Sequence, residues 1–273
     1  MSSPSSTFLS HFENSLEEIL TTLSNLRKWE PCIEEIAQKI VTTLTSGHKL
    51  LFCGNGGSAS DSSHIACEFT CRFCEDRRPF PAIALAAEPG LLTAIGNDYQ
   101  FEELFRRQVI AFGQPGDILI GLSTSGNSAN VIAALQEGNR RGLTTVAFLG
   151  HDGGKAAGIA QLEVIIPGKT TARIQEAHKF LLHVICEIAE KSLVHYSSWE
   201  KTVILQMFTD IILNSAVDDE FRIIASLIGF SKKPVAAYSC VTPVLVSSTV
   251  STHCRTAFLV PCSSSTTEFF KTL

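Results

Sequence analysis

The chain has 273 residues, of which 45% are apolar and 18% are charged, and its formal net charge at pH 7 is −5. This apolar fraction is enough for a globular core, and the length suits one domain with extensions or two small domains. Because the net charge is negative and Lys and Arg form no run, the composition argues against a nucleic-acid-binding surface.

The start of the chain and its cysteines indicate a cytoplasmic protein. MSSPSSTFLSHFENS has neither the basic start nor the apolar segment of a signal peptide. No apolar run approaches the roughly 20 residues of a membrane helix. We expect the nine cysteines to be mostly free and buried, as in a reducing compartment. Cys67, Cys71 and Cys74 have helical spacing, but no second pair completes a structural zinc site, so we favour core packing for them.

The chain begins with helical patterns and continues with short apolar runs that alternate with longer helical ones. Apolar positions recur at helical spacing over residues 8–26, and Glu30-Pro31 can start a second helix that ends at Gly47. The expected strands are 49–53, 82–86, 117–122, 144–149 and 162–166. The expected helices are 58–73, 101–112, 128–141, 155–159 and 171–193. This alternation predicts an α/β fold with a parallel sheet, helices on both faces, and ligands at the carboxyl edge of the strands.

We divide the chain into three parts. Residues 1–48 form an N-terminal helical segment that packs on the core, 49–195 form the α/β domain, and 196–273 form a C-terminal extension of unknown role. Within this extension, 200–214 and 219–227 have helical patterns, and the last part is rich in Ser, Thr and Val with weak strand signals.

Two loops that directly follow strands have the composition of ligand-binding loops. The first, GNGGS, begins at Gly54, and the second, STSGNS, begins at Ser123; each precedes a helix. Free N–H groups at helix N-termini bind anions, and the hydroxyls of the second loop can donate to phosphate oxygens. We therefore favour a monophosphate site over ordinary capping. Neither loop fits a nucleotide P-loop, a dinucleotide fingerprint or a hydrolase nucleophile elbow.

Acid–base candidates follow the glycine loop and recur in the long helix. His64 and Glu68 are four residues apart on one face of the first helix, close to the expected ligand edge. A carboxylate there could act as a general base and a His as an acid or metal ligand, although such a pair is more often a surface hydrogen bond. The long helix carries Gln175, His178 and His183, and periodicity leaves open which His faces the site.

Together these segments resemble the phosphoheptose isomerases, which are sedoheptulose 7-phosphate isomerases of the sugar isomerase (SIS) fold. The resemblance covers about residues 8–191 and rests on CGNGGSASDSSHIACEFTCRF, PAIAL, GNDYQFEELFRRQV, GDILIGLSTSGNSANVI, GHDGGKAAG and RIQEAHKFLLHVICEIAEK. It implies a three-layer α/β sandwich with a five-stranded parallel sheet, in a homotetramer with active sites between subunits. It also implies conversion of D-sedoheptulose 7-phosphate to D-glycero-D-manno-heptose 7-phosphate, for bacterial heptose and lipopolysaccharide precursor synthesis.

The resemblance assigns roles to individual residues. Glu68 would be the base and His183 the acid of an enediol mechanism, and one Zn²⁺ per subunit would be held by His64, Glu68, Gln175 and His183. Cys67 and Ala172 stand where family members often have acidic residues. The substrate-binding positions implied are Asn55, Gly56, Gly57, Ser58, His64, Glu68, Asn97, Asp98, Ser123, Thr124, Ser125, Ser128 and Gln175.

Two non-enzymatic functions are also compatible with parts of the sequence. A related SIS protein that binds the replication initiator DnaA shares the glycine loop, the ARIQE segment and a stretch similar to residues 91–98, but it lacks the Glu and the second His. A sugar-phosphate sensing module without turnover would need only the loops. Because this chain has both Glu68 and His183, we favour the isomerase.

Overall fold

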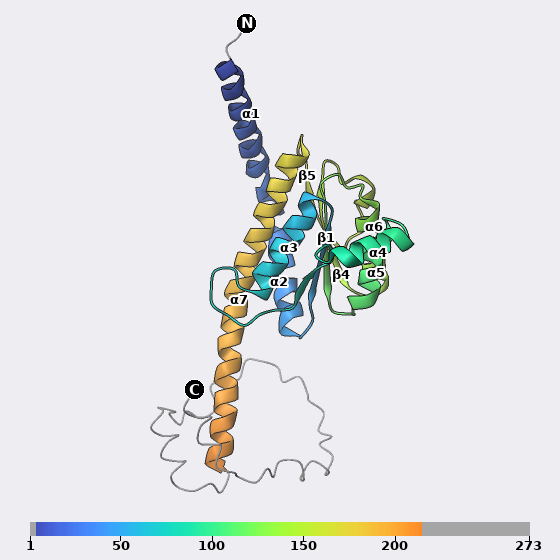
Figure 1. Ribbon diagram of the computed structural model, residues 1–273. Helices are drawn as coiled ribbons and strands as arrows, with labels where there is room; N and C mark the ends of the chain where they lie inside the picture. The colour runs from blue at the N-terminus through green and yellow to red at the C-terminus, as the bar shows by residue number, and fades with distance from the viewer. Residues whose placement is uncertain (1–3, 215–273) are drawn as a thin grey trace. The chain divides into compact units, whose positions relative to one another are not determined.

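The computed structural model describes residues 4–214 (Figure 1). These residues lie almost entirely in one compact unit, Met1–Ile211. The expected helix 219–227 and the segment rich in Ser, Thr and Val lie outside the described residues.

Five strands form one parallel sheet in the order β2-β1-β3-β4-β5. β1 and β3 are buried along their whole length, because both faces of each strand are apolar and covered by helices. The chain runs from β1 outward to β2 and then crosses back to β3, so the strand order reverses between β1 and β3. Ligand sites in such sheets form at this reversal, outside the carboxyl ends of the strands. The strands are β1 (Leu50–Gly54), β2 (Ala82–Ala84), β3 (Ile118–Ser123), β4 (Thr144–Gly150) and β5 (Leu162–Ile166).

Helices cover both faces of the sheet and produce two hydrophobic clusters. Alternate residues of β1 divide between them: Leu50 and Phe52 face one cluster, and Leu51 and Cys53 face the other. On the first face lie α2 (Glu30–Thr45), α3 (Gly57–Thr70) and α7 (Thr171–Asn214). On the second face lie α4 (Pro89–Asp98), α5 (Glu103–Phe112) and α6 (Ala129–Arg140). The expected three-layer α/β sandwich is confirmed.

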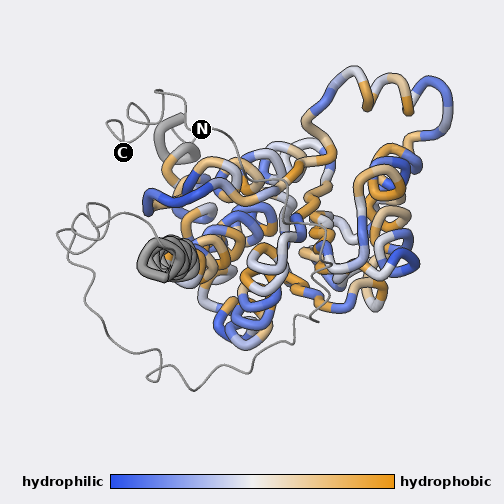
Figure 2. Tube along the Cα trace, turned by 90° about the horizontal axis from the view of Figure 1, so that it is seen from below, coloured by the Kyte–Doolittle hydropathy of each residue, from blue (hydrophilic) through white to orange (hydrophobic). Residues whose placement is uncertain are grey.

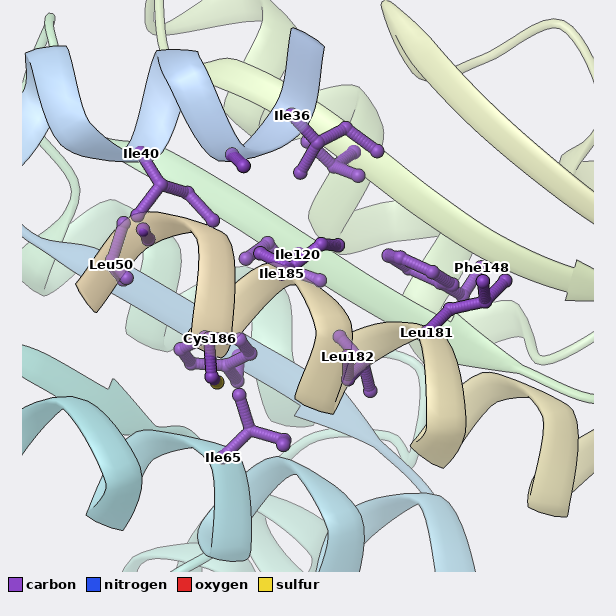
Figure 3. Close-up of a cluster of buried hydrophobic side chains, with 14 of the residues drawn as sticks. Ile36, Ile40, Leu50, Ile65, Ile120, Phe148, Leu181, Leu182, Ile185 and Cys186 are labelled. Carbon is purple, nitrogen blue, oxygen red and sulfur yellow. The ribbon is translucent and has the colours of Figure 1, made fainter. Parts of the chain in front are cut away.

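The first cluster binds α7 to the rest of the core. Figure 3 shows Ile185 of α7 next to Ile120 of β3, with Ile36 of α2 on one side and Ile65 of α3 on the other. Figure 2 shows hydrophobic and hydrophilic residues alternating along the helices, as expected for helices with one buried face. This packing fixes the position of α7 relative to α3, and both helices carry predicted site residues.

All five expected strands are confirmed within two residues, but several helices differ from expectation. Residues 155–159 form only a short 3₁₀ turn, Gly154–Ala156, and a 3₁₀ segment, Asn25–Trp29, follows α1 (Pro4–Ser24). α4 was not expected; it starts at Pro89, with the Glu88 side chain accepting from the Gly90 N–H.

The expected end of the long helix near residue 193 is wrong. α7 continues without interruption to Asn214 and includes the helix expected at 200–214. Its sequence contains neither Gly nor Pro, so no residue in it favours a helix end. The predicted boundary between residues 195 and 196 therefore falls inside this helix.

The cysteines differ partly from expectation. The six described thiols are free, and burial raises the pKa of Cys53 and Cys186 to about 12. Core packing for Cys67, Cys71 and Cys74 is wrong, because all three are exposed near the end of α3. Among the described residues, no helix is both long and apolar enough to span a bilayer.

Candidate active site

The two ligand-binding loops lie next to each other at the carboxyl edge of the sheet. The glycine loop follows β1, the hydroxyl loop follows β3, and these strands are paired up to Gly54 and Leu122. Asn55 of the glycine loop and Asn130 of α6 exchange two side-chain amide hydrogen bonds, each 2.8 Å long. Asn130 is fully buried, so this pair fixes the glycine loop against the start of α6. Sequence reasoning did not single out Asn130.

The glycine loop uses its glycines for both conformation and close approach. Gly56 has φ +56°, a conformation that favours glycine. A Cβ on Gly57 would overlap the side-chain amide of Gln175 on α7. Ser58, the second residue of α3, is buried. The loop thus brings its backbone against α7, where other predicted site residues lie.

The hydroxyl loop is hydrogen-bonded within itself and packs against a third loop. Ser123 Oγ donates to Ser128 Oγ at 3.0 Å, and Ser125 Oγ accepts from the Asn127 N–H at 3.1 Å. Gly126 has φ +65°, and a Cβ there would overlap the Gly153 carbonyl in the loop after β4. In the same region, a Cβ on Gly150 would overlap the Thr124 carbonyl. The GHDGGKAAG segment is therefore the platform of the predicted phosphate loop, a role that the sequence did not reveal.

The acid–base candidates converge from two helices. His64 and Glu68 extend from α3, with His64 Nε2 and Glu68 Oε1 3.5 Å apart. His183 extends from α7, and its Nε2 lies 2.8 Å from His64 Nε2. The two imidazole rings meet edge to face, with centroids 5.1 Å apart. The predicted convergence of these residues is thus present within one chain.

Asp61, which sequence reasoning missed, holds Gln175 and is itself paired with Lys179. Asp61 of α3 is buried and accepts from Gln175 Nε2 at 2.9 Å and from Lys179 Nζ at 2.9 Å. Because the amide nitrogen of Gln175 binds Asp61, its carbonyl oxygen is the atom left for a ligand. Asp61 precedes His64 by one helical turn, and that spacing was the available signal.

The structure separates the two histidines that periodicity could not. His178 is 1% exposed, and its Nε2 lies 3.0 Å from the Leu149 carbonyl oxygen. Burial lowers its pKa to about 4, with a smaller opposing effect from the bond to Leu149. His183 faces the candidate site instead. Its pKa is lowered first by burial and then by the positive charges of His64 and Lys179, while Glu68 and Asp61 oppose the shift.

Asn97 and Asp98 are not joined to this group. They lie exposed at the end of α4 and bond to each other at 2.8 Å. In the part of the chain that the structure describes, no hydrogen bond or ion pair connects them to the other predicted site residues. Asp98 instead lines a hollow of about 250 Å³ beside Tyr99 and Arg107.

The predicted zinc ligands have suitable donor chemistry but are drawn together more tightly than an ion requires. Two imidazole nitrogens bound to one tetrahedral zinc are about 3.3 Å apart, given Zn–N bonds of about 2.0–2.1 Å. The observed separation of His64 and His183 is 2.8 Å. Among the described residues, no group of three or more His, Cys, Asp and Glu is arranged as a metal site. Glu68 Oε1 lies 3.5 Å from His64 Nε2 and Gln175 is held by Asp61, so the donor types suit zinc while the two imidazoles are closer together than a bound ion would place them.

Comparisons with known proteins agree with this fold. The sequence profile of the SIS domain matches residues 11–150. A phosphoheptose isomerase from Roseiflexus sp. (strain RS-1) is 46% identical over 194 residues, covering 71% of this chain and 98% of the relative. One from Aquifex aeolicus (strain VF5) is 52% identical over 159 residues, covering 58% and 83%. The solved phosphoheptose isomerase GmhA from Neisseria gonorrhoeae is 38% identical, with a TM-score of 0.61 and coverage of 68% of this chain and 99% of that structure.

The chain therefore belongs to the SIS domain family. Within that family it belongs to the phosphoheptose isomerases, which are aldose–ketose isomerase enzymes. The resemblance predicted from the sequence is confirmed.

Proposed function

We propose that this protein converts D-sedoheptulose 7-phosphate to D-glycero-D-manno-heptose 7-phosphate, a step in bacterial heptose and lipopolysaccharide precursor synthesis. The observation that carries the proposal is the convergence of His64, Glu68 and His183 from α3 and α7, where α3 begins at the glycine loop on the carboxyl edge of the sheet. A DnaA-binding protein or a sensor would not need this acid–base group. The similarity to relatives named phosphoheptose isomerase supports the choice of substrate.

The proposed reaction moves a proton between C1 and C2 of the sugar, which are the carbonyl carbon and the hydroxyl-bearing carbon beside it. Glu68 removes a proton from one carbon, which gives an enediol, and returns it to the other carbon. His183 transfers the hydroxyl proton between the oxygen atoms on C1 and C2. Burial lowers the pKa of His183 and so favours the neutral imidazole, in which one ring nitrogen donates while the other accepts.

The two loops would bind the two ends of the substrate. Ser123, Thr124, Ser125 and Ser128, with the N-terminus of α6, would hold the phosphate through hydroxyl and backbone donors. The glycine loop exposes backbone that can approach the sugar without side-chain obstruction. Binding the phosphate away from Glu68 would fix the carbonyl end of the sugar between the two helices.

We also propose one zinc ion per subunit, held by His64, Glu68, Gln175 and His183. When bound, zinc would polarise the carbonyl oxygen as a Lewis acid. Asp61 would keep the carbonyl oxygen of Gln175 directed at the ion by holding the amide nitrogen. Metal analysis of the purified protein tests this: a stoichiometric ion in the wild type that is lost in Gln175→Leu supports it, and a metal-free active enzyme contradicts it.

The active form is proposed to be a cytoplasmic homotetramer with active sites between subunits. A groove of about 650 Å³ lies between the 3₁₀ segment after α1, α2 and α7, and Leu23, Ile33 and Val184 line it. Large apolar side chains are also exposed on two helices. An apolar surface of this extent is typical of subunit contacts. Sedimentation velocity of the full chain tests this, and a monomer at micromolar concentration would contradict it. The exposed apolar residues are Leu9, Phe12, Leu16 and Leu20 on α1, and Phe180 and Ile188 on α7.

The reaction itself is tested by proton exchange. Purified protein is incubated with sedoheptulose 7-phosphate in D₂O, and NMR follows exchange at C1 and C2 together with product formation. We expect exchange in the wild type, none above background in Glu68→Gln, and wild-type rates in Glu187→Gln, an exposed α7 control. Wild-type exchange no faster than Glu68→Gln would contradict the proposal. A pull-down with DnaA would then test whether this protein has the alternative, non-enzymatic function.

A further inference from the structure

Glu190 is a buried carboxylate on α7 that the proposed reaction does not use. It is 3% exposed. Its two oxygens accept the backbone N–H groups of Phe73 at 2.9 Å, Cys74 at 2.6 Å and Glu75 at 3.0 Å, and Arg77 Nε at 2.9 Å. Three consecutive backbone donors on one carboxylate fix a loop closely, because each bond to a charged acceptor is stronger than a neutral one. The loop is the segment 71–80, which leaves α3 and passes α7 before β2 (Figure 1).

Arg77 extends this connection to the end of α3. Its side chain is 1% exposed. One terminal nitrogen donates to the carbonyl of Glu68 at 2.6 Å and the other to the carbonyl of Phe69 at 2.9 Å. Carbonyls in the last turn of a helix have no partner within the helix, so an arginine there caps it. The residue capped directly is the proposed base.

Phe73 extends the same connection to the proposed acid. Its ring centroid lies 5.8 Å from that of His183, at an interplanar angle of 37°. His183 and Glu190 are seven residues apart on α7, which is about two helical turns. Glu190 therefore holds a loop that makes two contacts with the proposed catalytic residues. Phe73 of this loop lies against the His183 ring, and Arg77 of this loop binds the backbone carbonyl of Glu68.

We propose that Glu190 and Arg77 form a positioning pair that sets the placement of Glu68 relative to His183. A buried ion pair is weak evidence for stability, because desolvation offsets much of its Coulombic attraction. An apolar side chain could fill the same space, but it would leave the three backbone N–H groups without acceptors. The ion pair fixes the positions of specific backbone groups, because the planar guanidinium binds two carbonyls of α3 and the carboxylate binds three N–H groups of the loop. The kinetic part of this inference rests on the proposed function.

The first test is a comparison of steady-state kinetics in matched variants. Glu190→Gln keeps the shape but removes the charge and turns an amide donor toward N–H groups. Arg77→Lys keeps the charge and loses the fork. Glu187→Gln is the control, since Glu187 lies on the same helix and forms an exposed ion pair with Lys191. We expect kcat to fall about 10- to 100-fold in the first two variants, with KM changed less than about threefold, and no change in the control.

The second test does not depend on turnover. The ¹H chemical shift of His183 Cε1–H reports the ring current of Phe73, and Phe73→Leu supplies the reference for its loss. We expect Glu190→Gln and Arg77→Lys to move this signal in the same direction as Phe73→Leu, and Glu187→Gln to leave it unchanged. If Glu190→Gln is recovered only as aggregate, Arg77→Lys carries both measurements.

The outcomes separate this inference from the proposed function. A folded Glu190→Gln or Arg77→Lys with wild-type kcat and an unmoved His183 signal would overturn the positioning role. A wild type without isomerase activity, whose His183 signal still moves in the variants, would remove the proposed function and leave the positioning pair in place.

Discussion

The buried His178 gives the folded protein a pH dependence whose size follows from the structure. The ring is 1% exposed, and its pKa is about 4, against 6.5 for an ordinary histidine, mainly because of burial. The folded-state pKa lies below the unfolded one, so between pH 6.5 and 4 the unfolded chain binds a proton that the native state does not. The free energy of unfolding therefore falls as the pH is lowered through this window. At about 1.4 kcal/mol per pH unit, the loss from this residue reaches about 3 kcal/mol at pH 4.

The assay is denaturant unfolding of the wild type and His178→Gln at pH 7 and at steps down to pH 4. A Gln amide keeps a donor for the Leu149 carbonyl but does not titrate. Other groups titrate equally in both proteins, so the difference between them isolates the imidazole. We expect the wild type to lose about 3 kcal/mol more than the variant. His11→Gln, on an exposed face of α1, serves as the control and is expected to follow the wild type. Equal losses in the wild type and His178→Gln would refute the reasoning.

Three further substitutions examine the loops. Gly126→Ala is expected to lower the free energy of unfolding by about 1–3 kcal/mol more than Gly158→Ala in thermal unfolding, because both glycines have positive φ but only Gly126 meets a backbone carbonyl. Equal losses of stability would contradict the contact. A Cβ at Gly57→Ala would displace the side-chain amide of Gln175, so we expect kcat/KM to fall about tenfold or more with the free energy of unfolding nearly unchanged. Gly96→Ala places its Cβ in open space and should have wild-type activity. Asn130→Leu leaves its partner amide unpaired and should cost about 1–3 kcal/mol in urea unfolding; no loss would show that the pair is dispensable.

The sequence predicted the sheet well because its strands are buried on both faces. Such strands are continuous apolar runs, and their edges are marked by the polar loops that bind ligands. The same feature located the glycine and hydroxyl loops. By contrast, α4 begins at Pro89-Gly90, a pair that is equally typical of a turn, and α7 extends through a part of the chain for which no packing partner could be inferred.

The supporting residues of the site could not be predicted because their partners are distant in sequence. Glu190 binds backbone groups more than a hundred residues earlier, and Asp61 binds the side chain of Gln175 across a similar separation. Helical periodicity gives the angle of a residue on its own helix but not the helix that it faces. Periodicity therefore could not choose between His178 and His183; the family resemblance assigned His183, and the structure buries His178 against Leu149.

The contact between the hydroxyl loop and the loop after β4 restricts how this protein can be recombined. The Thr124 carbonyl occupies the space that a side chain on Gly150 would need, and the Gly153 carbonyl occupies the space that a side chain on Gly126 would need. The shapes of the two loops are therefore complementary. A chimaera that took only the hydroxyl loop from a distant relative would combine two loop surfaces whose shapes do not match. The two segments therefore have to be exchanged together, although a helix and a strand separate them along the chain.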